Sequence, residues 1–100
     1  MSKNRFRISK QALHDLDDIW LYTFNKWSKE QADRYYGLII EEIEFIADNF
    51  FTGKSAEQTR KNYRVTKIKS HLIFYRKSAN DIVEVVRILH QRIDIKKQLK

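Results

Sequence analysis

The chain has 100 residues, of which 20 are Lys or Arg and 13 are Asp or Glu, so its formal net charge is +7. With 42% hydrophobic and 33% charged residues, it has the composition of a folded globular protein, and this length supports a single core, so we expect one domain over residues 1–100. The absence of Cys excludes disulfides, Cys-ligated zinc, iron–sulfur clusters and thiol nucleophiles.

The first half of the chain has the pattern of a short strand followed by two helices. Residues 5–8 alternate polar and apolar side chains, which predicts a strand. Ser9 is a candidate N-cap, and apolar residues spaced by three or four predict a helix over about 10–25. Ser28 with Gln31 forms a capping-box pattern that opens a second helix running to about residue 50. The connection of two or three residues predicts an antiparallel helical hairpin, with Trp20 and Trp27 packed in the core or between the helices.

The second half has the pattern of β-structure. Residues 63–66 alternate, residues 72–75 form a short apolar run, and residues 82–90 are dominated by Val, Ile and Leu. Residues 78–81 read as a turn, and connections this short require an antiparallel meander. Helices followed by strands predict an α+β fold, in which the hairpin packs on one face of a small antiparallel sheet that the N-terminal strand joins.

The positive charge lies almost entirely in the second half. Residues 1–50 contain 7 basic and 9 acidic residues, whereas residues 51–100 contain 13 basic and 4 acidic ones. A field of this sign favours an acidic partner, either nucleic acid or an acidic protein segment. The N-terminus has no hydrophobic leader and no apolar run approaches the length of a membrane span, so we expect a cytoplasmic protein without a membrane partner.

Residues that could carry chemistry are few. Acidic pairs such as Asp15/Asp18 and Glu41/Glu44 are spaced to share a helix face, and we interpret them as a solvated surface. The three His residues, 14, 71 and 90, show no metal-ligand spacing, and two Gly residues cannot build a phosphate-binding loop, so we expect neither metal nor cofactor. His90 titrates near neutral pH and is the one candidate for acid–base work, although it and Arg92 equally fit a strand end that binds a carboxylate.

A basic set with interleaved aromatic residues falls on the predicted strands. Residues 60–77 contain seven Lys or Arg and no acidic residue, with aromatic side chains among them. Such a surface is typical of nucleic-acid binding, where cations hold phosphates and rings stack on bases. An ordinary basic sheet edge that discourages aggregation fits the pattern as well.

Four blocks of sequence resemble the ParE toxins of the RelE/ParE superfamily. They are residues 15–22 (DLDDIWLY), 32–36 (ADRYY), 70–76 (SHLIFYR) and 86–94 (VRILHQRID), and they span most of the chain in the family's order and spacing. The resemblance implies two antiparallel helices packed on an antiparallel sheet. It also implies the toxin of a type II toxin–antitoxin system, a non-catalytic protein that poisons DNA gyrase by stabilising its complex with cleaved DNA.

The resemblance also implies partners and sites. A ParD-type antitoxin, with an acidic amphipathic C-terminal segment, would bind the toxin and form an oligomer with it. We expect this segment to contact Trp20, Tyr36, Arg64, Lys67 and Lys69. The second partner would be gyrase, with or without its bound DNA. We expect gyrase to be contacted by Arg76, Arg87, His90 and Arg92, although Arg87 equally suits an ion pair with Glu84 or with Asp17 or Asp18.

Two alternatives remain open at this stage. RelE toxins, the other branch of the superfamily, cut messenger RNA on the ribosome with cations on the sheet and, in well-known members, a Tyr near the C-terminus. This tail has no Tyr, which favours the gyrase branch, but some ribosome-dependent relatives use His or Glu. An endoribonuclease would use Arg64 and Arg76 on the scissile phosphate and His90 as acid or base. The other alternative is a nucleic-acid-binding module without toxicity.

Overall fold

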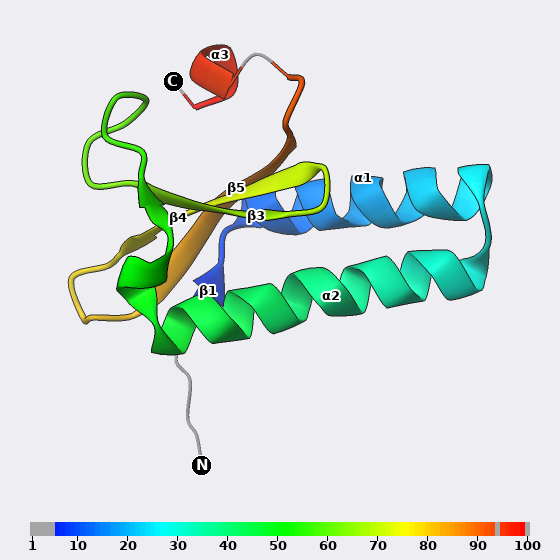
Figure 1. Ribbon diagram of the computed structural model, residues 1–100, viewed down its shortest axis with the longest axis horizontal. Coiled ribbons are helices and arrows are strands. Elements are labelled where there is room, and N and C mark those ends of the chain that lie inside the picture. Colours follow the sequence, from blue (N-terminus) through cyan, green and yellow to red (C-terminus); the bar gives the residue numbers. More distant parts are fainter. Residues whose placement is uncertain (1–5, 94, 100) are drawn as a thin grey trace.

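The computed structural model describes residues 6–93 and 95–99 and confirms the predicted α+β architecture. Strand β1 (Phe6–Ile8) leads into helix α1 (Lys10–Lys26) and helix α2 (Lys29–Asp48). A 3-10 turn, η1 (Phe50–Thr52), then precedes the strands β2 (Lys54–Ser55), β3 (Arg64–Ile68), β4 (His71–Lys77) and β5 (Val83–His90), and a short helix α3 (Ile95–Gln98) ends the chain. Figure 1 shows the helical hairpin as one layer that runs past the sheet toward the turn joining the two helices.

Both predicted helix starts are confirmed by their caps. The Ser9 hydroxyl accepts a hydrogen bond from the Ala12 N–H at 3.0 Å, and the Ser28 hydroxyl accepts one from the Gln31 N–H at 3.1 Å. Each cap satisfies a backbone donor that the first turn of a helix leaves without a partner. Residue 5, with which the predicted N-terminal strand begins, lies outside the described residues.

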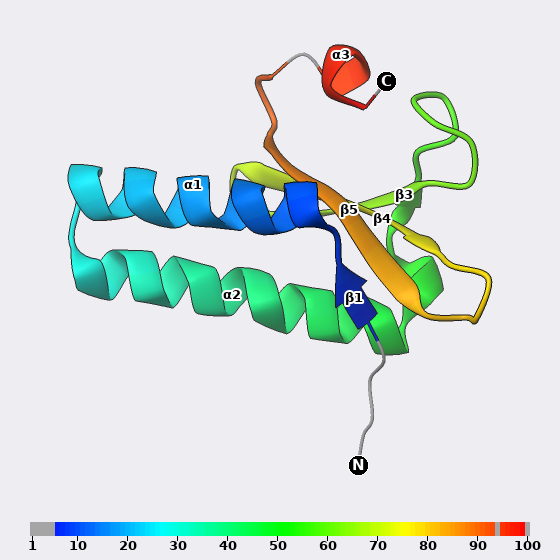
Figure 2. The ribbon, with the colours of Figure 1, turned by 180° about the vertical axis from the view of Figure 1, so that it is seen from behind.

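The sheet contains five strands in the order β1-β5-β4-β3-β2. The predicted antiparallel meander of β3, β4 and β5 is confirmed. The N-terminal strand does join the sheet, but it pairs in parallel with β5, with Phe6 opposite Val83, so the sheet is mixed. Figure 2 shows β1 beside β5 at the root of the hairpin. The elements from α1 to β4 lie between these two strands, and this long connection permits the parallel pairing, because parallel neighbours need a crossover.

Apolar clusters cover both faces of the sheet. The hairpin face buries residues from α1, α2, β4 and β5, namely Ala12, Leu16, Ile39, Ile43, Ile73, Val85 and Ile88. The opposite face buries Phe74 and Leu89, which Ala56 and Leu99 cover. Because side chains alternate along a strand, neighbouring residues of β4 and β5 supply both clusters. No helix among the described residues is both long and apolar enough to cross a membrane.

The apolar residues that are spaced by three or four along α1 are less buried than this spacing predicts. Of its apolar members only Leu16 is fully buried, while Phe24 is 43% and Trp27 is 67% exposed. The far half of the hairpin extends beyond the sheet and has no second layer to cover it (Figure 1). The prediction of a packed Trp27 is therefore wrong. Trp20 does pack within the hairpin, since its ring stacks on Phe24 and its Nε1–H donates to Asp33 of α2 at 2.9 Å.

Candidate functional site

The strand register separates the predicted site residues into two groups at opposite ends of the sheet. Arg76 of β4 lies opposite Glu84, and Arg64 of β3 lies opposite Tyr75, so both arginines belong to one end. His90 pairs with His71 at the other end of the same ladder. Five residue steps along β4 separate the two ends, which is about 17 Å at normal strand spacing. The three residues expected for an endoribonuclease are therefore not brought together.

Arg76 and Arg64 are both engaged by the protein itself. The Arg76 guanidinium contacts the Glu84 carboxylate at 2.9 and 3.0 Å, and Arg7 approaches the same carboxylate at 3.6 Å. The Arg64 Nη2 donates to the carbonyls of Phe51 and Gly53, which follow α2 directly. Arg64 therefore fixes the turn that leads from α2 to β2, and its Nε is buried without a hydrogen-bond partner among the described residues.

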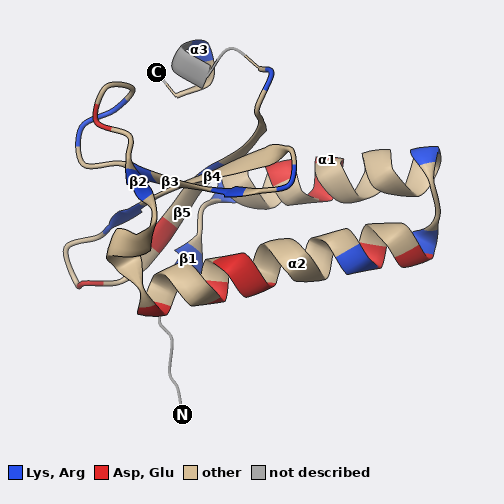
Figure 3. Cartoon of the chain, in the orientation of Figure 1, with Lys and Arg blue, Asp and Glu red and all other residues tan. Residues whose placement is uncertain are grey.

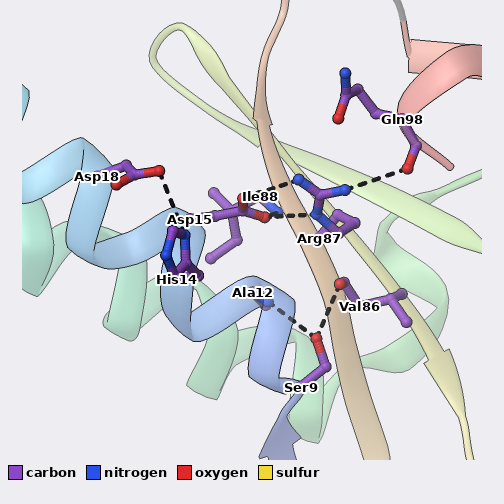
Figure 4. Close-up of polar contacts among 9 residues, drawn as sticks. All are labelled: Ser9, Ala12, His14, Asp15, Asp18, Val86, Arg87, Ile88 and Gln98. Atoms are coloured by element: carbon purple, nitrogen blue, oxygen red, sulfur yellow. Dashed lines mark hydrogen bonds and ion pairs between the residues drawn. The ribbon is translucent and has the colours of Figure 1, made fainter.

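Arg87 forms an ion pair with a residue that sequence reasoning did not select (Figure 4). Its Nε and Nη2 donate to the two oxygens of Asp15 at 2.8 and 3.0 Å, and the Ile88 N–H donates to the same carboxylate at 2.9 Å. The side chains are only 15% and 13% exposed, and the hydrogen bond to Asp15 raises the Arg87 pKa above its usual value. The prediction that Arg87 pairs with Glu84, Asp17 or Asp18 is thus wrong. The interpretation of Asp15 as part of a solvated surface is also wrong.

Arg87 lies at an irregularity of β5. The register places Phe74 opposite Arg87 but Tyr75 opposite Val85, so Val86 is an extra residue on the β5 strand. A bulge of this kind bends the strand and redirects its side chains. Here Arg87 turns toward α1 while its Nη1 also donates to the Gln98 carbonyl at 3.2 Å. One guanidinium therefore joins α1, β5 and α3, which is a structural role.

At the opposite end, three polar side chains from different elements converge. His71 and His90 meet edge to face with ring centroids 5.3 Å apart, and the Tyr35 hydroxyl of α2 lies 2.7 Å from the His71 Nδ1. Burial, reinforced by the neighbouring His90, lowers the His71 pKa to about 4. The Arg92 backbone N–H donates to the His90 Nδ1 at 3.1 Å, so neutral His90 carries its proton on Nε2. His71 is therefore a neutral hydrogen-bonding group at physiological pH.

These three side chains form one wall of a groove of about 780 Å³ between the hairpin and the β3–β4 turn. Tyr22 and Trp27, which are 62% and 67% exposed, lie along it from the hairpin side. The groove is also lined by three exposed cations, by the carboxylate of Asp18 and by apolar or uncharged polar residues. The cations are Lys26, Arg34 and Lys69. The groove therefore combines exposed aromatic surface with positive charge.

The residues predicted to meet an antitoxin occupy different surfaces. Lys69 lines the groove, and Lys67 is exposed on β3, where β2 no longer pairs with it. Trp20 and Tyr36 do not line the groove, although Tyr36 is 37% exposed. Of the predicted target contacts, His90 and Arg92 are exposed and adjacent, whereas Arg76 lies at the far end of β4.

Tyr35 and His71 were missed as site residues from the sequence. Both fall in blocks that resemble the ParE toxins, but nothing in those blocks marks them as site residues, and 36 positions separate them along the chain. The predicted antiparallel pairing of β4 and β5 could have indicated that His71 lies near His90, because the observed register places them opposite each other. No group of three or more His, Asp or Glu suited to a metal ion occurs within the described residues.

The chain is similar to toxins of one family. Residues 6–95 match the profile of the family described as ParE toxin of type II toxin–antitoxin system, parDE. The chain is 38% identical over 94 residues to Toxin ParE1 of Caulobacter vibrioides, covering 94% of this chain and 96% of that one. It is 33% identical over 96 residues to Toxin ParE1 of Mycobacterium tuberculosis, covering 96% of this chain and 98% of the relative.

A solved structure supports the fold. The chain superposes with a TM-score of 0.73 on a structure titled "Chromosomal ParDE TA system from P. aeruginosa", covering 88% of this chain and 98% of that one. The sequence identity in this match is 17%, so the likeness concerns the arrangement of helices and strands. The α+β fold is thus supported by an independent comparison.

Proposed function

The chain belongs to the ParE toxin family of type II toxin–antitoxin systems, and we propose that it acts by binding DNA gyrase and stabilising the complex in which DNA is cleaved. A ligand shifts an equilibrium only by binding one state more tightly than the other. The toxin needs no catalytic group for this action. Its antitoxin, as the second member of the system, is the partner that holds it inactive.

The observation that carries this proposal is the separation of Arg64 and Arg76 from His90. General acid–base cleavage of RNA needs the proton-transferring group and the phosphate-binding cations within hydrogen-bond reach of one substrate. The two ends of β4 are too far apart for one phosphodiester, and both arginines already bind groups of the protein. This arrangement supports inhibition by binding over ribosome-dependent cleavage.

We place the gyrase contact at the C-terminal end of β5. His90 and Arg92 are exposed there, and the His90 Nε2–H is directed by the backbone hydrogen bond on its Nδ1. Arg87 is excluded from this set, since its charge is neutralised by Asp15, and Arg76 lies at the opposite end. The gyrase site that we propose is thus smaller than the one expected from the sequence.

We place the antitoxin in the groove between the hairpin and the β3–β4 turn. An amphipathic acidic segment fits it, because its apolar side would cover Tyr22 and Trp27 while its carboxylates meet Lys26, Arg34 and Lys69. His90 belongs to the same groove, so a bound antitoxin would cover the proposed gyrase contact. Steric masking of this kind would explain neutralisation without a conformational change.

Incubation of the purified chain with gyrase, ATP and supercoiled plasmid tests the proposal. We expect linear plasmid after the complexes are denatured, and no new RNA ends on translating ribosomes. Arg92→Ala should abolish linearisation and growth arrest while antitoxin binding persists, whereas Lys10→Ala, an exposed cation at the start of α1, should retain all three. Cleavage within ribosome-bound codons, or full activity of Arg92→Ala, would contradict the proposal.

A further inference from the structure

An exposed aromatic side chain, Phe51, is held by several contacts at the end of the sheet that the proposed function does not use. It is 75% exposed, more than any other large hydrophobic side chain described. Its carbonyl accepts a hydrogen bond from the Arg64 Nη2 at 3.2 Å, and its ring lies 5.1 Å from that guanidinium. The ring also meets Phe50 edge to face at 5.0 Å. Tyr75 anchors the same turn, since its hydroxyl donates to the Phe50 carbonyl at 2.7 Å.

Phe51 borders a recess of about 320 Å³ whose lining includes the cations Arg64 and Lys77. Lys77 lines the recess with its Nζ 4.8 Å from the centre of the Phe50 ring, and Tyr63 and Asn62 line it from the loop before β3. Figure 3 shows Lys and Arg on β2, on the loop that follows it and at the end of β4, while Asp and Glu gather on α2. Glu57 is the one carboxylate in the lining of the recess.

An exposed ring beside a lysine that forms no salt bridge within the described residues suits a single nucleic-acid strand. Each base has a flat face that stacks on an aromatic side chain, and the adjoining phosphates bind Lys or Arg. Lys77 and Lys54 are exposed, and neither forms a salt bridge within the described residues. The carboxylates of an acidic peptide could pair with these cations, but such a peptide would offer no planar base to stack on the exposed Phe51 ring. Charge and shape together therefore favour a nucleotide.

We propose that Phe51 and Lys77 form a binding surface for single-stranded DNA, with a base stacked on Phe51 and an adjoining phosphate on Lys77. This goes beyond the proposed function, because a gyrase poison need not touch DNA. The choice of DNA over RNA rests on the proposed function, since gyrase opens DNA. Arg64 is the positioning residue that presents the ring.

Fluorescence anisotropy of a labelled 12-nucleotide single-stranded DNA, titrated with the full chain, measures this binding without gyrase. We expect Phe51→Ala to weaken the affinity about 5- to 150-fold, the range given by loss of one base–aromatic stack, and Phe51→Trp to retain it. Lys77→Ala should also reduce the salt dependence by about 0.7 in log–log slope, as loss of one phosphate contact does. Phe45→Ala is the matched control, because Phe45 is 50% exposed on the acidic helix α2 and should leave binding unchanged.

Three results would overturn the inference. They are DNA binding that Phe51→Ala leaves intact, equal competition by a 12-residue oligoglutamate, and a marked preference for the corresponding RNA. Plasmid linearisation by gyrase is measured separately on the same variants. Its loss in Arg92→Ala with intact oligonucleotide binding would show that the two surfaces act independently, so failure of either proposal can be recognised.

Discussion

Replacement of Asp15 by Asn tests whether the ion pair with Arg87 stabilises the fold. The Asp15 carboxylate accepts three hydrogen bonds, at 2.8 and 3.0 Å from Arg87 and at 2.9 Å from the Ile88 N–H. The amide introduced by Asp15→Asn would be uncharged and could accept only part of this set. The Arg87 guanidinium would then remain in place, 15% exposed and without a counter-charge.

The expected cost follows from this burial. Breaking one side of a buried ion pair costs about 3–5 kcal/mol, and because this pair keeps some solvent contact we expect about 3 kcal/mol. In urea, with a denaturant slope of about 1–3 kcal/mol per M, the unfolding midpoint should fall by roughly 1–3 M. Urea unfolding followed by circular dichroism measures the midpoint. Asp17→Asn on the exposed side of α1 is the control and should change stability by less than about 0.5 kcal/mol.

A double-mutant cycle separates the pair from its surroundings. Asp15→Asn and Arg87→Gln should be non-additive by about 1–3 kcal/mol, because each single change already removes the same contact. Equal stability of Asp15→Asn and Asp17→Asn, or strict additivity, would refute the reasoning. It would also return Arg87 to the candidate gyrase contacts, where the sequence first placed it.

Three further predictions concern other parts of the fold. Because unfolded His71 takes up a proton near pH 6.5 but folded His71 only near pH 4, stability should fall as pH is lowered through this window. The full shift corresponds to about 3 kcal/mol, which partial solvent exposure reduces to roughly 1–2 kcal/mol. His71→Gln should lose this component of the pH profile of urea midpoints and His14→Gln should keep it, whereas identical profiles would contradict the assignment. Gly37→Ala should stabilise the protein by about 0.5–1 kcal/mol, because a methyl group at this helical position meets no atom of a neighbouring element within 4 Å. Gly53→Ala should destabilise the protein, because the added methyl group would lie 2.9 Å from the Val65 carbonyl and closer still to the Tyr75 hydroxyl. Melting temperatures that move in the same direction for both would contradict this. Leu99→Ala should cost about 2 kcal/mol, because Leu99 covers Phe74 and Leu89 on the sheet face opposite the hairpin. An unchanged melting temperature would show that Leu99 does not stabilise that cluster.

The helices and the meander could be predicted from the sequence because their causes are local. The spacing of apolar residues and the serines at positions 9 and 28 determine the two helices and their starts. Short connections leave the three long strands only one way to pair. The family resemblance added the same fold independently, and the structural comparison agrees with it.

The site could not be predicted because its contacts depend on register over long distances. The bulge at Val86 turns Arg87 toward Asp15, and no local sequence pattern predicts such a bulge. His71 and His90 become neighbours only once β4 and β5 are paired at a particular offset. Exposure of Trp27 depends on how far the hairpin extends beyond the sheet, which is a property of the whole assembly.

The parallel pairing of β1 with β5 has a consequence for how the toxin is made. Ser9 donates to the carbonyl of Val86, 77 positions later, and Asp15 meets Arg87 across 72 positions. During synthesis on the ribosome, the first strand and the first helix must wait for the end of the chain before the core can close. Contacts of such long range slow folding. The groove that His71 and His90 help to line can therefore be completed only after translation has passed the end of β5.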